Sequence, residues 1–420
     1  MTRDTSPRTD DLRSSPRPLH LLDSAGKAEA LKPLAAARGI TLQVSAPATP
    51  APDSQRAICL QSVPATADAH WFSHVDPHHV PVRFHLPQVA ELVITPAQDE
   101  ARCTAAADAL MQLGLQVLLA PARPGLLVDR IRHACLNEAL ALLGEGVPAA
   151  EVEKAGVDAG LVSGPLALLD AQGLGVTDAL YHQTLDGHGC CGHAHDHHHG
   201  HGHDHTHHHH VHEHDDDSHG SSCADQGQDD GHHHHHHGHH HDHEHHEHHH
   251  HAHRHHDHAH HHHAHEHHHG HDGDAPSWPA MTDEAVYVME KMAHGFQRKG
   301  GAPGQGFYSL DDDDDLELWS GLSSFVRRSL KLPADDARDR LRFITAVEVL
   351  QALDSRAAGN AATIEMASAG TGLWADAAHG PVAFIRSQDA DTFAARAAEL
   401  AQAYGPRFAL PDNWQKLLPG

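Results

Sequence analysis

A histidine-rich stretch divides this chain and decides what each part of it can fold into. Of the 55 histidines in the 420-residue sequence, 45 lie between His188 and His271, interspersed mainly with Asp, Glu and Gly. This stretch has no apolar periodicity and cannot bury a core, so we expect residues 188–274 to be a disordered insert. The sequences on either side are rich in Ala and Leu and predict globular structure.

The insert is also a predicted metal-binding segment. Imidazole nitrogens suit Zn, Ni, Cu and Co, and many of them on a flexible tether give overlapping sites at high local concentration. No zinc-finger spacing occurs, so we expect capacity for several divalent ions such as Ni or Zn. The alternative is a repeat that expanded in a permissive loop and binds metal only incidentally. The candidate ligands at its start are Cys190, Cys191, His193, His195, His197, His198, His199, His201, His203 and His205.

Charge and composition exclude several classes of function. The formal net charge is −28 with histidine neutral, and no clustered basic face is visible, so we expect no nucleic-acid partner. No run of about 18 apolar residues occurs, so no membrane span is expected. The N-terminal residues are polar and the six cysteines are scattered, which is typical of neither a secretory signal nor a disulfide framework. We therefore expect a reduced, cytoplasmic protein.

Hydrophobic patterns predict an α/β first part. Residues 1–17 are expected to be a disordered tail, and residues 18–122 alternate between strand and helix patterns, which favours an open, largely parallel sheet. The expected strands span residues 20–23, 41–44, 57–61, 89–95 and 115–119, and the expected helices span residues 26–38 and 99–113.

The pattern changes to an all-helical one after residue 126. A long amphipathic helix begins at Leu127 and is closed by Gly144 and Gly146. Further helices are expected at residues 149–156, 165–172, 282–294, 316–329, 335–353 and 390–404.

Two segments of this helical part carry a family pattern. PGLLVDRIRHACLNEALALLGEGV, from Pro124, and VDAGLVSGPLALLDAQGLG, from Val157, closely resemble the start of the C-terminal helical domain of 3-hydroxyacyl-CoA dehydrogenases. That family reads P-G-F-hydrophobic-V-N-R, then N-E-A, E-G-V and G-P-x-x-L-x-D-x-x-G-L. The matching positions are Pro124, Gly125, Val128, Arg130, Asn137, Glu138, Ala139, Glu145, Gly146, Gly164, Pro165, Leu168, Asp170, Gly173 and Leu174.

The resemblance resumes beyond the insert, and it implies a domain order. KMAHGFQRKGGAPGQGFYSLDD resembles the family's G-R-x-G-x-K-x-G-x-G-F-Y segment, and the sequence after it resembles a second copy of the helical domain. Two copies are typical of the dehydrogenase portion of the multifunctional fatty-acid β-oxidation α-subunit, and the helical domain implies a homodimer. The implied domains are a truncated Rossmann-like domain at 18–122, a first helical domain at 123–187 and 275–310, and a second at 311–420.

The resemblance also implies a reaction and its residues. The family oxidises a 3-hydroxyacyl-CoA to a 3-ketoacyl-CoA with NAD, with a histidine as general acid/base and a glutamate that orients it. His70 in AHWFSHVD and Glu91 in VAELVIT are the candidate pair, with DPHHVPVRFH taken as an added loop between them. Asp129 stands where the family has a substrate-contacting Asn, and Ser62 stands for its substrate-contacting Ser.

One family feature has no counterpart in the sequence. The glycine string G-x-G-x-x-G, which lets the NAD pyrophosphate approach a helix N-terminus, is absent. Only Gly26 and Gly39 precede the first matched segment. Three hypotheses follow: an NAD-linked 3-hydroxyacyl-CoA dehydrogenase, an inactive homologue that binds, stores or senses divalent metal, or a scaffold subunit.

Overall fold

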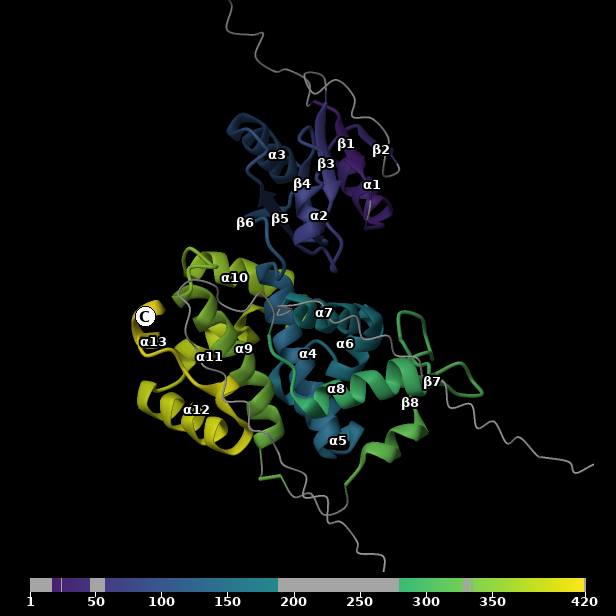
Figure 1. Ribbon diagram of the computed structural model, residues 1–420, viewed down its shortest axis with the longest axis vertical. Helices are drawn as coiled ribbons and strands as arrows, with labels where there is room; N and C mark the ends of the chain where they lie inside the picture. The colour runs from purple at the N-terminus through teal and green to yellow at the C-terminus, as the bar shows by residue number, and fades with distance from the viewer. Residues whose placement is uncertain are drawn as a thin grey trace, which may run out of the picture. The chain divides into compact units, whose positions relative to one another are not determined.

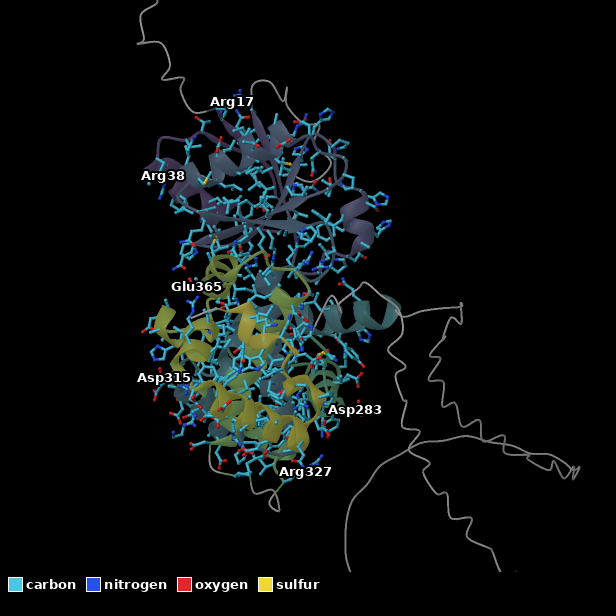
Figure 2. The ribbon with its side chains drawn as sticks, turned by 90° about the vertical axis from the view of Figure 1, so that its left-hand side faces the viewer. Arg17, Arg38, Asp283, Asp315, Arg327 and Glu365 are labelled. Carbon is cyan, nitrogen blue, oxygen red and sulfur yellow. The ribbon has the colours of Figure 1, made fainter. Side chains whose placement is uncertain are left out.

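The computed structural model describes residues 17–23, 25–45, 57–187, 279–327, 332–333 and 335–418. Their elements are drawn in Figure 1, and charged side chains such as Arg38, Asp315 and Arg327 project from the surface in Figure 2. The predicted insert, with all ten of its candidate ligands, lies outside the described residues, as does nearly all of the predicted N-terminal tail.

The first part of the chain is an α/β domain built on six strands. The strand order is β2-β1-β3-β4-β5-β6, and every neighbouring pair is parallel except β4 and β5. This confirms the predicted α/β class with a mainly parallel sheet. The strands are β1 (Leu19–Leu22), β2 (Leu42–Ser45), β3 (Ile58–Ser62), β4 (Val80–His85), β5 (Val89–Ile94) and β6 (Gln116–Pro121), and the helices are α1 (Ala28–Ala37), α2 (Ala69–Ser73) and α3 (Glu100–Gln112).

Strand β4 corrects the prediction of a loop between residues 76 and 85. Val80, Val82 and Phe84 are buried in the core of the α/β domain, while Arg83 and His85 alternate with them. A period of two with one apolar face is the pattern of a strand. The segment was misassigned because it was aligned as an extra loop, whereas its own alternation indicates a strand that pairs with β5.

The second part of the chain is helical, as predicted, and is organised around one buried helix. Helix α4 (Leu127–Glu145) has 17 buried residues among its 19. A helix that is buried on nearly all sides needs partners on nearly all sides. Its neighbours in Figure 1 include α5 (Ala149–Ala159), α6 (Pro165–Gln172), α8 (Asp283–Glu290) and α9 (Asp336–Asp354). The remaining helices are α7 (Leu174–Gly187), α10 (Ala361–Gly370), α11 (Pro381–Ser387), α12 (Ala390–Tyr404) and α13 (Trp414–Leu417).

The helix predicted at 316–329 is wrong. Residues Leu316–Leu318 form strand β8, which pairs antiparallel with β7 (Tyr308–Leu310), and a short 3-10 turn follows at Ser320–Phe325. No helix forms there because the acidic turn of residues 311–315 pairs the two strands and because Gly321 allows a tight turn after them. A Cβ atom at Gly321 would lie 2.3 Å from the ring of Trp319, so this tight turn excludes a larger side chain.

The sequences on both sides of the insert are joined by one carboxylate. Asp170 on α6 accepts hydrogen bonds from the backbone amides of Phe307 (2.7 Å) and Tyr308 (2.9 Å). A Cβ atom at Gly306 would lie 1.7 Å from the Asp170 carboxylate, so only glycine fits there. The family-like residues Asp170, Gly306, Phe307 and Tyr308 therefore join the segments before and after the insert within one helical region.

The same order of elements occurs twice in the helical part. The 19-residue helices α4 and α9 are each followed by a shorter helix, and then by a helix that begins with proline after glycine, at Gly164-Pro165 and Gly380-Pro381. Between these elements an antiparallel bridge joins Leu161 to Trp374.

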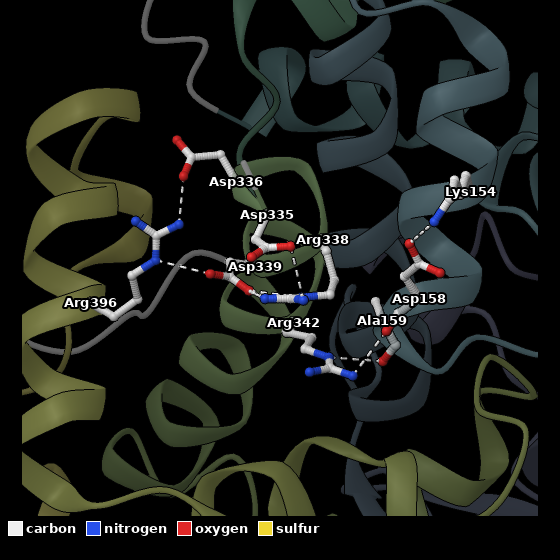
Figure 3. Close-up of polar contacts among 9 residues, drawn as sticks. All are labelled: Lys154, Asp158, Ala159, Asp335, Asp336, Arg338, Asp339, Arg342 and Arg396. Carbon is white, nitrogen blue, oxygen red and sulfur yellow. Dashed lines mark hydrogen bonds and ion pairs between the residues drawn. The ribbon is translucent and has the colours of Figure 1, made fainter. Parts of the chain in front are cut away.

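Polar contacts at the start of α9 connect it to two other helices (Figure 3). Arg396 on α12 donates to Asp336 (2.5 Å) and Asp339 (3.0 Å). On the other side, Arg342 donates to the carbonyl oxygens of Ala159 (3.1 Å) and Asp158 (3.0 Å) at the end of α5. These contacts fix α9 between α5 and α12.

A buried carboxyl on α5 gives the fold a pH dependence. Glu153 accepts hydrogen bonds from Tyr308 Oη and the Ala167 amide, both at 2.9 Å. Burial raises its pKa from 4.5 to about 6. Because the folded carboxyl holds its proton to higher pH than the unfolded one, its contribution is present below about pH 4.5 and is lost as pH rises through about 6. This loss amounts to about 2 kcal/mol.

We therefore expect Glu153→Gln to remove this loss. Between pH 4 and pH 7 the free energy of unfolding of the parent, measured by urea denaturation, should fall by about 2 kcal/mol relative to that of Glu153→Gln. The exposed Glu151 on the same helix supplies the matched control, Glu151→Gln. Parallel stability curves for parent and Glu153→Gln would contradict the expectation.

None of the described helices is both long enough and apolar enough to cross a membrane.

Candidate active site

The β4–β5 hairpin places a histidine beside a glutamate. Arg83 lies opposite Glu91 in this antiparallel pair, and His85 lies opposite Val89. His85 and Glu91 are therefore diagonal neighbours on one face of the sheet. Their side chains meet with His85 Nε2 2.7 Å from Glu91 Oε2, and the exposed fractions are only 7% and 1%. A carboxylate that orients an imidazole in this way is the arrangement that general acid/base catalysis uses.

A buried ion pair lies next to this histidine–glutamate pair. The Arg83 guanidinium donates to Asp129 at the start of α4 through Nε (2.9 Å) and Nη2 (3.2 Å). Burial alone would raise the pKa of Asp129, but the charge of Arg83 outweighs it and holds that pKa well below its usual range. Burial opposes the charge on Arg83 too, and Asp129 outweighs that effect and raises the pKa of Arg83. Asp129 is thus an ionised acceptor held by an arginine.

The structure does not bring His70 to Glu91. His70 lies on α2 with its side chain exposed, and its ring contacts that of His74 at a centroid distance of 4.1 Å. Among the described residues, neither a hydrogen bond nor an ion pair joins His70 to Glu91. The imidazole at Glu91 belongs to His85, which the sequence reasoning missed because it read β4 as a loop. The alternation of Val80, Val82 and Phe84 was the signal that could have found it.

Ser62 faces a different part of the domain. It ends β3, and its Oγ accepts a hydrogen bond from the Ala25 amide (3.0 Å) and lies 3.1 Å from Asp23 Oδ1. These partners belong to the turn between β1 and α1. Of the four sequence-predicted residues, Glu91 belongs to the hairpin pair and Asp129 bonds to the neighbouring Arg83. Ser62 contacts the β1–α1 turn, and His70 lies on the surface.

The β1–α1 turn is where a dinucleotide pyrophosphate binds in a Rossmann fold. In this chain a carboxylate occupies that position: Asp23 Oδ1 accepts from the Lys27 amide (2.7 Å) and Oδ2 accepts from the Ala28 amide (2.9 Å). Burial acts to raise the pKa of Asp23, but these hydrogen bonds and that of Ser62 outweigh it and lower the pKa. The amides at the start of α1 thus already have an anionic partner.

Glu91 lines one small cavity. The cavity that Glu91 lines with Leu118, Pro121 and Leu126 holds only about 10 Å³. This is about the volume that one water molecule needs. Larger cavities lie elsewhere, including one of about 420 Å³ lined by Gln88, Ser368 and Trp374. The pair is therefore enclosed in this conformation.

A cluster of possible metal ligands lies on the helices next to the insert. Asp178 and His182 on α7 and His294 on the π-helical turn Lys291–Gly295 offer ligand atoms within 4.8 Å of one another. His182 and His294 are about half exposed, and both imidazoles approach the Asp178 carboxylate. Helix α7 ends at Gly187, directly before the histidine-rich sequence begins.

Part of the helical region matches a known protein family. Residues 125–197 match the family model described as the 3-hydroxyacyl-CoA dehydrogenase C-terminal domain. The match covers part of the helical region, which is therefore similar to the C-terminal domain of 3-hydroxyacyl-CoA dehydrogenases. The match confirms the resemblance that was drawn from the motifs around Arg130, Glu138 and Gly164-Pro165.

Three solved structures of dehydrogenases are similar to this chain at low identity. The dehydrogenase part of multifunctional enzyme 1 from C. elegans is 12% identical, with 94% of this chain and 71% of that chain covered and a TM-score of 0.46. (S)-3-hydroxybutyryl-CoA dehydrogenase from Ralstonia eutropha is 19% identical, with 40% and 80% covered and a TM-score of 0.30. The Escherichia coli 3-hydroxybutyryl-CoA dehydrogenase is 19% identical, with 39% and 35% covered and a TM-score of 0.28. The relationship rests on residues 125–197 and not on these superpositions.

Proposed function

We propose that this chain is a 3-hydroxyacyl-CoA dehydrogenase homologue that does not turn over NAD and that binds divalent metal ions, such as Ni or Zn, through residues 188–271. The absence of NAD turnover is inferred from Asp23, whose carboxylate accepts hydrogen bonds from the backbone amides of Lys27 and Ala28. The observation that carries the second half is the concentration of 45 histidines in the insert.

The dehydrogenase reaction needs a general acid/base and a site for NAD. His85 and Glu91 fit the general acid/base pair that removes the proton from the 3-hydroxyl group. The β1–α1 turn does not fit NAD, because its helix amides are bonded to a carboxylate whose charge would repel a pyrophosphate. The residues thus supply the proton-transfer half of the reaction without a partner that takes the hydride.

The surroundings of His85 support the same proposal. An acyl-CoA has to reach the imidazole, and the cavity beside Glu91 admits about one water molecule. The family's Asn position is Asp129, whose two oxygens are both engaged by Arg83. An acceptor locked in an ion pair cannot donate to a substrate oxygen as an amide would.

Metal binding is supported by the histidine content of the insert and by the Asp178–His182–His294 cluster. Neutral imidazoles are the donors that Ni and Zn prefer among histidine and carboxylate side chains. Asp178, His182 and His294 extend this donor set onto the folded helices where the insert begins. Metal bound by the insert is held mainly through neutral histidine and is released on acidification.

We also infer that the helical region from α9 onward is a second copy of the family domain. The repeated order of a 19-residue helix, a shorter helix and a Gly-Pro helix start supports this inference, as does the bridge between Leu161 and Trp374. A homodimer through the helical domains stays a prediction from the family resemblance.

One experiment tests both halves of the proposal. The full chain is stripped of metal, reloaded with Zn²⁺ or Ni²⁺, and titrated with NADH, and NADH oxidation by acetoacetyl-CoA is then followed. We expect neither NADH binding nor oxidation in any metal state. We expect several equivalents of metal per chain, and loss of most of them when the histidines of 188–271 are replaced by glutamine at constant length.

The controls separate the possible outcomes. NADH oxidation that is abolished by His85→Ala and kept by His70→Ala would overturn the first half and establish a working dehydrogenase. Equal metal content in the parent chain and the glutamine variant would overturn the second half.

A further inference from the structure

Three side chains with metal-binding atoms meet inside the α/β domain, and none of them belongs to the His85–Glu91 pair. His20 on β1 and Cys59 on β3 are directly paired in the parallel ladder, so both project from the same face. His79 immediately precedes β4. Their ligand atoms all lie within 4.8 Å of one another, and their exposed fractions are 4%, 2% and 0%.

Three of the four imidazole nitrogens of this cluster make no hydrogen bond among the described residues. Among the described residues, His20 Nδ1 and both ring nitrogens of His79 are buried without one. Leaving a buried polar atom unpaired costs about 1–3 kcal/mol. The fold accepts this cost at two neighbouring rings, whose centroids are 5.7 Å apart. A shared ligand would explain why both rings are kept there.

Outer partners orient both rings. Ser45 Oγ lies 2.8 Å from His20 Nε2, which leaves Nδ1 for a ligand. Asp76 Oδ2 lies 3.4 Å from His79 Nδ1, which leaves Nε2. The His79 amide also donates to the Asp76 carbonyl oxygen (2.9 Å), so the ring is held in a turn. An oxygen on one ring nitrogen and a free second nitrogen is the usual arrangement around metal-bound histidine.

The donor set selects a class of metal ion. Two imidazoles and one thiolate suit Zn²⁺ and Cu⁺, whereas Ca²⁺ and Mg²⁺ require oxygen ligands. Both imidazoles are buried, with exposed fractions of 4% and 0%. Burial raises the pKa of the Cys59 thiol, which disfavours a reactive thiolate in the absence of a metal.

We propose that His20, Cys59 and His79 form a buried binding site for one zinc-class transition-metal ion. The site goes beyond the proposed function, since it uses no residue of 188–271. It ties β1, β3 and the start of β4 together at three points, so its role is to stabilise the sheet. Cys59 also lines a cavity of about 310 Å³ with Ile58, His78 and Arg102.

The test must separate this site from the insert, which also contains cysteines. The full chain carrying Cys190→Ser, Cys191→Ser and Cys223→Ser is stripped of metal and titrated with Co²⁺. Cobalt bound to a thiolate gives a charge-transfer absorption that cobalt bound only to histidine and carboxylate lacks. We expect this absorption to level off at the intensity of one thiolate-bound Co²⁺ per chain, although more than one equivalent must be added because the insert also takes up Co²⁺, and we expect Zn²⁺ to displace it.

Two variants in the same background locate the thiolate. We expect Cys59→Ser to abolish the charge-transfer absorption, and Cys103→Ser, at a half-buried thiol on α3, to leave it unchanged. Zn²⁺ should raise the melting temperature of the background and Cys103→Ser proteins by more than that of Cys59→Ser, in which any remaining shift comes from the other metal-binding residues.

A further variant keeps the test decisive if Cys59→Ser fails to fold. His79→Gln retains the thiol and removes one ligand, so we expect a weakened, shifted absorption with the fold preserved. An absorption that survives Cys59→Ser, or one absent from the folded background protein, would overturn the site. Neither result would bear on metal binding by the insert, which is measured by its histidine-dependent stoichiometry.

Discussion

Arg340→Met is expected to lower the free energy of unfolding by about 3–5 kcal/mol. Arg340 is fully buried on α9 and bonds two carboxylates of α4: Nε donates to Glu138 (2.6 Å), and Nη1 and Nη2 donate to Glu145 (2.5 and 2.6 Å). Removing the arginine leaves Glu145 without its partner in a partly buried position. Glu138 keeps only Arg407, which donates to it at 2.7 Å.

The loss should appear as a lower urea midpoint and a lower melting temperature by circular dichroism. Arg386→Met is the matched control, because Arg386 makes one ion pair with Glu365 and both side chains are more than 40% exposed. Such surface pairs contribute about 0–1 kcal/mol. Adding Glu145→Gln to Arg340→Met should restore part of the stability, since the uncompensated charge of Glu145 is then gone while Glu138 still pairs with Arg407. A loss below about 1 kcal/mol for Arg340→Met would show that the network is not coupled to folding.

The helical region could be predicted from the sequence because its signals are local and redundant. The apolar spacing of α4, its closing Gly146 and the Gly-Pro start of α6 each indicate the same element boundaries. The Glu138–Arg340 pair is of another kind, since its residues are 202 positions apart. Periodicity carries no information about such a partner, so the family motif N-E-A was recognised without its structural role.

The candidate site was predicted less well for a different physical reason. Glu91 and Asp129 were found through motifs, but the histidine depends on how β4 pairs with β5. One residue of register moves every side chain to the opposite face of a sheet. Reading residues 76–85 as a loop therefore removed His85 from consideration and left His70 as the candidate. The His20–Cys59–His79 cluster could not be predicted from the sequence either, because its residues meet only through the strand order β1-β3-β4.

Asp129→Asn, which restores the family's residue, is expected to destabilise the protein by about 3–5 kcal/mol without creating dehydrogenase activity. The Asp129 and Arg83 side chains are only 7% and 12% exposed. An asparagine keeps the shape but removes the charge, and its NH₂ group points a donor at a guanidinium that has only donors. Arg83 then retains its bond to the Val63 carbonyl oxygen (3.3 Å) and the nearby charge of Glu91.

The pH dependence of that variant distinguishes lost charge from lost packing. Because Arg83 holds the pKa of Asp129 below its unfolded value, the pair's stability is present above about pH 4 and is lost as pH falls toward the folded pKa. The gap between parent and Asp129→Asn in urea denaturation should therefore be full at pH 7 and shrink with acidification. The double variant Arg83→Met, Asp129→Leu removes both charges and should unfold at a midpoint close to the parent's. A stability difference that is independent of pH would assign the effect to packing. NADH oxidation by Asp129→Asn would show that the Arg83–Asp129 ion pair prevents dehydrogenase activity in the parent protein.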